Sequence, residues 1–144
     1  MFDEQYVDPS RVNFDAFKAL DRTTPILMLN KLKFYDRARY EAGHALANTA
    51  MTGAEAYAQY GTDSGPIFSR VGGSIIWRGN FESTVIGPSD ESWDQVFIAR
   101  YPNAGAFLEM VTDPVYQQAV KHRQAAVLTS RLQRFGELEL GDTF

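Results

Sequence analysis

The sequence predicts an α+β domain in which a short first helix precedes the order strand, helix, strand, strand, helix, strand. Three observations carry this prediction. Residues 26–34, ILMLNKLKF, alternate with a period of two, which is typical of a strand. Thr52 and Glu55 form a capping box that opens a helical pattern ending at Gly72-Gly73. Residues 94–132 pass from a strand through helical segments and back into a strand.

The N-terminal part predicts an arm, a short helix and a central strand. Residues 1–9 have no clear period, and Asn13 is a plausible N-cap for a helix over 13–20. In the strand 26–34, both faces begin apolar, which predicts a strand buried on both sides. Asn30 lies on the face shared by Ile26, Met28 and Leu32. Its amide either satisfies a neighbouring backbone group or donates into a pocket.

The middle of the chain predicts an irregular insertion, a helix and a hairpin. Residues 35–51, which contain His44, are charged and then small, with only a marginal helical turn. In the helix that follows, we expect a kink or break at Pro66. A second strand is expected over 74–86, with Ile75, Trp77 and Gly79 on one face and a bulge or close backbone approach at Gly79. A third strand over 93–101 pairs with it in an antiparallel hairpin.

The C-terminal part predicts a helix pair and a last strand. Asn103 caps a helix, and Asp113-Pro114 opens the next one. That second helix places an arginine on the same face as apolar residues, which are Tyr116, Ala119, Val120, Ala126 and Val127. Arg123 must therefore find an anionic or carbonyl partner or reach water. We expect either an internal pair with Glu109 or Asp113, or an opening onto a cavity. The last strand is expected over 128–139.

This order is the ferredoxin-like βαββαβ arrangement, a four-stranded antiparallel sheet with the main helices on one face. The other face carries either the Met28, Asn30, Leu32 set or the Leu27, Leu29, Lys31 set, and neither is polar enough to be left in water. A second copy packed sheet to sheet would cover it and would leave a gap suited to a ligand. We divide the chain into an arm and short helix (1–24), the domain (25–138) and a tail (139–144).

Composition excludes several classes of function. The 144 residues suffice for one domain with a single core. The absence of cysteine excludes disulfides and Cys-ligated metals, and the two histidines are far apart in sequence. We therefore expect no metal and no nucleotide cofactor. A net charge of −4 argues against nucleic acid, no apolar run is long enough to span a membrane, and the acidic start MFDEQYVD argues against export. A cytoplasmic protein is expected.

The patterns ILMLNKLKF, GAEAYAQYG, VGGSIIWRGNF and the long stretch from Phe97 to Leu132 resemble the dimeric α+β barrel superfamily. Within it, the chain is most similar to the family named domain of unknown function 1330, over about residues 25–136. The resemblance implies a homodimer whose two sheets form a barrel. Relatives in the superfamily include cofactor-free monooxygenases of phenolic or quinone-type substrates, small-molecule lyases and isomerases, and haem-handling proteins. The family itself has no established reaction, so the resemblance supplies no catalytic residues.

Two hypotheses of function follow. The first is a cofactor-independent enzyme, resembling a monooxygenase, isomerase or lyase, that acts on a small aromatic or carbonyl compound. The second is a non-catalytic binding or assembly protein that uses the sheet face only to dimerise. For the first, His122 is the candidate general base, its alternative being a helix-surface imidazole. The candidate ligand-binding residues are Asn30, Tyr57, Trp77, Arg78, Arg100, Tyr116 and Arg123.

Overall fold

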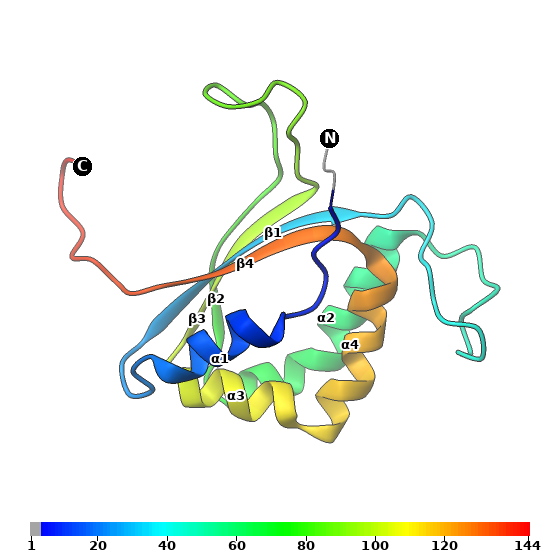
Figure 1. Cartoon of the computed structure of the whole chain (residues 1–144), viewed down its shortest axis with the longest axis horizontal. Helices are drawn as coiled ribbons and strands as arrows, with labels where there is room; N and C mark the ends of the chain where they lie inside the picture. Colours follow the sequence, from blue (N-terminus) through cyan, green and yellow to red (C-terminus); the bar gives the residue numbers. More distant parts are fainter. Residues whose placement is uncertain (1–3) are drawn as a thin grey trace.

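The computed structural model describes residues 4–144 and confirms the α+β order (Figure 1). The elements are α1 (Arg11–Ala19), β1 (Ile26–Phe34), α2 (Gly53–Arg70), β2 (Ser74–Gly79), β3 (Gln95–Tyr101), α3 (Ala104–Thr112), α4 (Pro114–Ala126) and β4 (Val127–Phe135). The strands form one antiparallel sheet in the order β2-β3-β1-β4. This is the ferredoxin-like order, with β1 and β3 in the centre. A loose arm was expected over residues 1–9; residues 4–9 contain no helix or strand, and residues 1–3 lie outside the described range.

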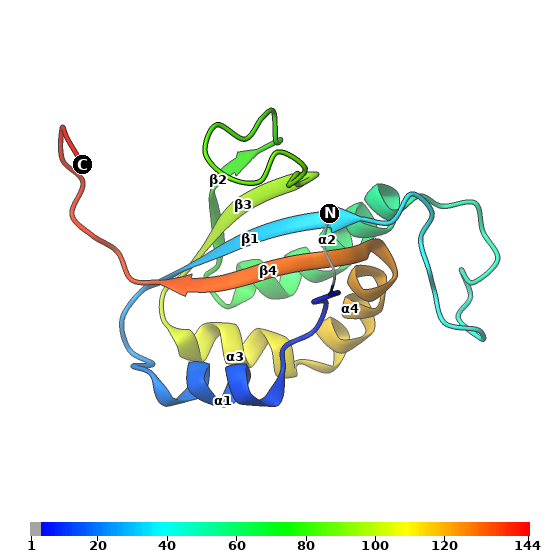
Figure 2. The ribbon, with the colours of Figure 1, turned by 45° about the horizontal axis from the view of Figure 1, so that its top comes forward.

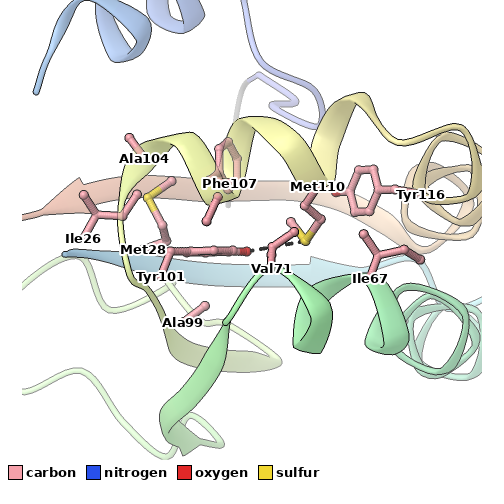
Figure 3. Close-up of a cluster of buried hydrophobic side chains, with 11 residues drawn as sticks. Ile26, Met28, Ile67, Val71, Ala99, Tyr101, Ala104, Phe107, Met110 and Tyr116 are labelled. Carbon is pink, nitrogen blue, oxygen red and sulfur yellow. Dashed lines mark hydrogen bonds between the residues drawn. The ribbon is translucent and has the colours of Figure 1, made fainter. Parts of the chain in front are cut away.

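All helices lie on one side of the sheet (Figures 1 and 2). Ile26 and Met28 of β1 belong to a buried cluster with Ile67 of α2 and with Phe107 and Met110 of α3 (Figure 3). The helices therefore cover the Ile26, Met28, Asn30, Leu32 face of β1. The opposite side of the sheet, which we call the open face, carries residues of all four strands. They include Leu27, Leu29, Lys31, Trp77, Val96, Ile98 and Phe135.

The second strand differs from the prediction. It ends at Gly79 instead of Ile86, and its pairing with β3 shifts between Ile75 and Trp77. Ile75 pairs with Ala99, on the helix side, whereas Trp77 pairs with Ile98, on the open face. The prediction that Ile75 and Trp77 share a face is therefore wrong, because one extra residue inverts the alternation of a strand.

Gly79 makes the close approach that the sequence allowed, but it is not the site of the register shift. An added Cβ there would lie 2.7 Å from the Trp77 ring. The six-membered part of that indole therefore occupies the space beside Gly79.

The helix boundaries follow local capping, with two departures from prediction. The capping box of Thr52 and Glu55 is present, and Asn103 and Asp113 cap α3 and α4 as predicted. However, α1 begins after Ser10, whose side chain accepts a hydrogen bond from the Asn13 backbone N–H, so Asn13 lies inside the helix. The helix α2 also continues through Pro66 to Arg70 without a break.

The long packing of α2 against α4 explains why one lost N–H does not interrupt α2. The first turn of the same helix is fixed by backbone hydrogen bonds to the chain that leaves β1. Both contacts position α2, which carries two of the aromatic side chains of the candidate site described below.

Candidate functional site

A cavity of about 1700 Å³ lies between the helix side of the sheet and the helices. We call it the helix-face cavity. Strands β1, β3 and β4 form one wall, and α2, α3 and α4 form the other. The arm and α1 pass across the remaining side, in front of the space between sheet and helices (Figure 1). The expected cavity was a gap between two sheets. This one lies within a single chain, on the opposite side of the sheet.

The arm and α1 are attached to the body by hydrogen bonds, ring contacts and apolar packing. The Ser130 backbone N–H donates to the Tyr6 carbonyl (2.8 Å), and Arg134 donates to the carbonyls of Phe17 and Asp21. The Phe17 ring meets Phe107 edge to face, with 5.1 Å between centroids. No residue of α1 is fully buried. The N-terminal segment is therefore a cover over the cavity that is held by hydrogen bonds to its main-chain carbonyls and by the packing of Phe14 and Phe17 on the core.

Aromatic rings make up much of the wall. Tyr57 and Tyr60 lie on α2 with centroids 5.3 Å apart, and the Tyr60 and Tyr116 hydroxyls share a hydrogen bond of 2.8 Å. Burial raises the pKa of Tyr57, Tyr60 and Tyr116 above the usual value of 10.0, while the charge of Arg123 opposes that rise. Since burial dominates, all three phenols are neutral at physiological pH. The wall thus combines apolar surface with hydroxyl groups that donate hydrogen bonds.

Two of the predicted polar residues occupy the same cavity. Asn30 is buried, and its side-chain nitrogen donates to the Met28 carbonyl (3.0 Å) while the residue lines the cavity. Arg123 is 9% exposed and donates to the Val7 carbonyl and to Ser130 Oγ (3.2 Å). The expected pair of Arg123 with Glu109 or Asp113 is therefore wrong.

Two contacts explain why Arg123 does not pair with Asp113. Asp113 is taken by Arg70 (2.8 Å), while the sequence-distant arm brings a carbonyl to Arg123. The other expectation for Arg123, an opening onto a cavity, matches where the side chain lies.

The remaining candidate residues are divided between the cavity and other surfaces. Tyr57, Arg78 and Tyr116 line the helix-face cavity together with Asn30 and Arg123. Trp77 and Arg100 lie on the open face, where Trp77 is 51% exposed and Arg100 pairs with Glu137 (2.8 Å). These two residues therefore do not line the helix-face cavity.

His122 lies outside the cavity, in a hydrogen-bonded chain of its own. Its Nδ1 is 2.7 Å from the Tyr40 hydroxyl, and its Nε2 is 3.2 Å from Asp63 Oδ2. The neutral imidazole fits this chain when Tyr40 donates to Nδ1 and Nε2–H donates to the carboxylate. His44 stacks on Tyr40 at 4.5 Å and Tyr40 meets His122 edge to face, so the predicted insertion 35–51 docks onto α4 through these rings. A general-base role for His122 remains a prediction.

Sequence reasoning missed the α1 side chains as part of the site. Phe14 and Phe17 line the cavity, yet their helical spacing indicated only a short helix. It also missed the partners of His122, because Tyr40 and Asp63 lie far from it in sequence.

In residues 4–144 no group of three His, Asp or Glu side chains is arranged to hold a metal ion. None of the helices in that range is long and apolar enough to span a membrane.

Comparison with solved structures places this fold among close and distant relatives. A protein of unknown function from Rhodopseudomonas palustris is 52% identical, with a TM-score of 0.87 over 95% of this chain and 100% of that chain. Its methylated form is also 52% identical, with a TM-score of 0.88 over 96% and 98%. SnoaB from Streptomyces nogalater, a cofactor-independent oxygenase, shares the fold at 15% identity and a TM-score of 0.51, over 83% and 99%.

No curated protein matches the sequence. The model of one protein family matches residues 42–132, which include α2 to α4 and most of the sheet. The chain therefore belongs to the family described as domain of unknown function 1330.

Proposed function

We propose that this protein binds a small, partly aromatic molecule in the helix-face cavity. The observation that carries the proposal is the cavity itself, about 1700 Å³ in volume and lined by aromatic rings with a few polar groups. Ligand sites in proteins combine this kind of apolar wall with a small number of oriented polar side chains. The aromatic rings also match a flat ligand, because stacked and edge-to-face contacts favour aromatic partners.

The enzymatic form of the proposal is a cofactor-independent reaction at a carbonyl or phenol. Neutral hydroxyls of Tyr57 and Tyr116 and the cation of Arg123 would stabilise negative charge that develops on a substrate oxygen. This is the Tyr/Arg chemistry that an enolate or phenolate intermediate requires. The likeness to a cofactor-independent oxygenase is compatible with it, at the level of fold alone. His122 lies outside the cavity, so the proposal does not depend on that residue.

The protein is further proposed to be a homodimer joined through the open face. No helix of residues 4–144 covers this face, and Leu29, Ile98 and Trp77 lie side by side on it. The β2–β3 connection (80–94) and the tail (136–144) both project on the same side of the sheet, away from the helices (Figure 1). Ile86 and Leu140 on these segments are 96% and 97% exposed. Such a surface is typical of a protein–protein contact, and a second copy is the partner the fold suggests.

The dimer is tested by sedimentation at micromolar concentration. Leu29→Lys should reduce the mass from two chains to one, because it places a charge in the centre of the contact. Val115→Lys is the matched control, since Val115 is an exposed apolar residue of α4 on the other side of the molecule. A single-chain mass for the unaltered protein would overturn the dimer.

Ligand binding is tested by thermal shift and native mass spectrometry against small phenols, quinones, haem and carboxylates. A specific hit should raise the melting temperature in proportion to ligand concentration. Leu132→Trp, which fills the cavity from β4, should abolish the shift, whereas Leu138→Trp on the tail should not. A complete absence of hits would favour the alternative, a non-catalytic assembly protein that uses only its sheet face.

A further inference from the structure

The helix-face cavity contains a buried cation that no carboxylate of residues 4–144 neutralises. Arg123 is 9% exposed, and both acceptors that it reaches, the Val7 carbonyl and Ser130 Oγ, are neutral. No carboxylate within residues 4–144 forms an ion pair with it. A guanidinium has five N–H donors, of which two are used here. Three donors and the full charge are left for water or a ligand, and because no fully buried side-chain nitrogen in residues 4–144 lacks a hydrogen-bond partner, the unbonded Nε reaches accessible space.

The acidic residues nearest in sequence are occupied elsewhere. Asp113 caps α4 and pairs with Arg70 at 2.8 Å, and Asp63 faces His122 on the other side of α2. Asp8 of the arm accepts from Gln124, the residue after Arg123. A buried charge is costly unless it is paired, so a position like this one indicates either water or an anion from outside the chain.

The groups around the cation are also donors. The Tyr57 hydroxyl has no hydrogen-bond partner within residues 4–144, and the Tyr60–Tyr116 pair, which makes one bond of 2.8 Å, has a second hydroxyl hydrogen to donate. The charge of Arg123 acts on all three phenols, which places them within electrostatic range of it. Arg78 adds a second positive charge to the cavity wall. A ligand group that fits these surroundings must accept hydrogen bonds and carry negative charge.

The rest of the cavity wall is apolar and uncharged. Phe14 and Phe17 of α1, Phe97 of β3 and Phe107 of α3 line it, together with Met28 of β1. A ligand that fills both regions has an apolar aromatic body and an anionic oxygen group at one end.

We propose that Arg123 is an anion-binding residue and that the cavity takes an aromatic organic acid, whose carboxylate or phenolate oxygen contacts the Arg123 guanidinium while its rings lie against the phenylalanine wall. This assignment rests on the proposed ligand-binding function and specifies the ligand class for the same cavity. A carboxylate and a phenolate present the same chemistry to a guanidinium, so the experiment below includes both.

The experiment uses the full chain and calorimetric titration with 2-naphthoate, its neutral analogue 2-naphthamide, and 2-naphthol. In the unaltered protein, 2-naphthoate should bind about tenfold or more tightly than 2-naphthamide, since hydrogen bonds to a charged oxygen are about twice as strong as neutral ones. This preference should weaken as salt concentration rises. If the site selects a phenolate, 2-naphthol should gain affinity as pH rises through its own ionisation, while 2-naphthoate shows no such change.

Variants of Arg123 test whether its charge binds the ligand or only anchors the arm through Val7. Arg123→Met should abolish the preference for 2-naphthoate, and Arg123→Lys should retain part of it because the charge remains. Arg11→Met is the control, because Arg11 is an exposed cation of α1 that pairs with Asp15 and does not line the cavity.

Two outcomes would contradict the assignment. Equal affinity of the unaltered protein for 2-naphthoate and 2-naphthamide would refute the assignment and leave the cavity function intact, with Arg123 only an anchor for Val7. The first comparison needs no variant, so it holds even if Arg123→Met fails to fold. Binding of none of the three probes would count against both the assignment and the proposed function.

Discussion

Replacing Gly53 by alanine should destabilise the protein, although alanine is the better helix former. Gly53 is the first residue of α2, and an added Cβ would lie 2.2 Å from the Tyr35 carbonyl oxygen and 2.9 Å from that of Ala126. Real Cβ atoms essentially never approach another atom closer than 3.0 Å, so backbone must move. The movement also strains two hydrogen bonds, from Gly53 N–H to Tyr35 (3.1 Å) and from Tyr35 N–H to Ala126 (2.9 Å).

The magnitude follows from these contacts. Overpacking against backbone costs about 1–3 kcal/mol, and a strained backbone hydrogen bond adds about 1 kcal/mol. We therefore expect a loss of about 2–4 kcal/mol and a melting temperature lower by roughly 6–15 °C. Gly61→Ala, in the same helix, is the control, because an added Cβ there meets nothing within 4 Å and should stabilise by about 0.5–1 kcal/mol. Urea and thermal unfolding followed by circular dichroism measure both. A Gly53→Ala protein as stable as the Gly61→Ala protein would refute the proposed contact between α2 and the end of β1.

Phe17→Ala should lower the free energy of unfolding by about 1–2 kcal/mol, because the ring is only half-buried against Phe107. The loss of this ring from the cover of the cavity should also speed both entry and release of 2-naphthamide in stopped-flow measurements. Tyr40→Phe should remove the hydrogen bond to His122 and raise amide hydrogen exchange within residues 35–51, whereas unchanged exchange would show that ring packing alone holds this segment. The free energy of unfolding should fall as pH rises above about 10, because burial holds the pKa of the Tyr57, Tyr101 and Tyr116 phenols above that of the unfolded chain. Each phenol lowers the free energy of unfolding by at most about 1.4 kcal/mol per pH unit. A free energy of unfolding that stays constant to pH 11 would contradict the burial of these phenols.

Much of the fold could be predicted from local signals. The bounds of β1 follow from its alternation, and Thr52, Asn103 and Asp113 mark helix starts because a cap depends on only a few neighbouring residues. Pro66 misled the prediction for the same reason. Its local cost is real, but long-range packing of α2 on α4 outweighs it.

The candidate site depended more on long-range contacts and was harder to predict. Helical spacing placed Arg123 on a buried face, but its carbonyl partner Val7 is 116 residues away, which no local pattern encodes. The face of Trp77 was misassigned because the extra residue at Ile76 inverts the alternation without a sequence signal such as proline or glycine at that position. The choice between the two faces of β1 also required the positions of the helices.

The most direct test of the central claim is a nuclear magnetic resonance titration of the labelled protein with 2-naphthoate. A ligand in the helix-face cavity should shift the side-chain amide of Asn30, which lines the cavity, and leave the indole N–H of Trp77 on the open face unchanged. Saturation should follow a single dissociation constant. Shifts at Trp77 without shifts at Asn30, or no shifts at saturating ligand, would contradict a binding site between the sheet and the helices.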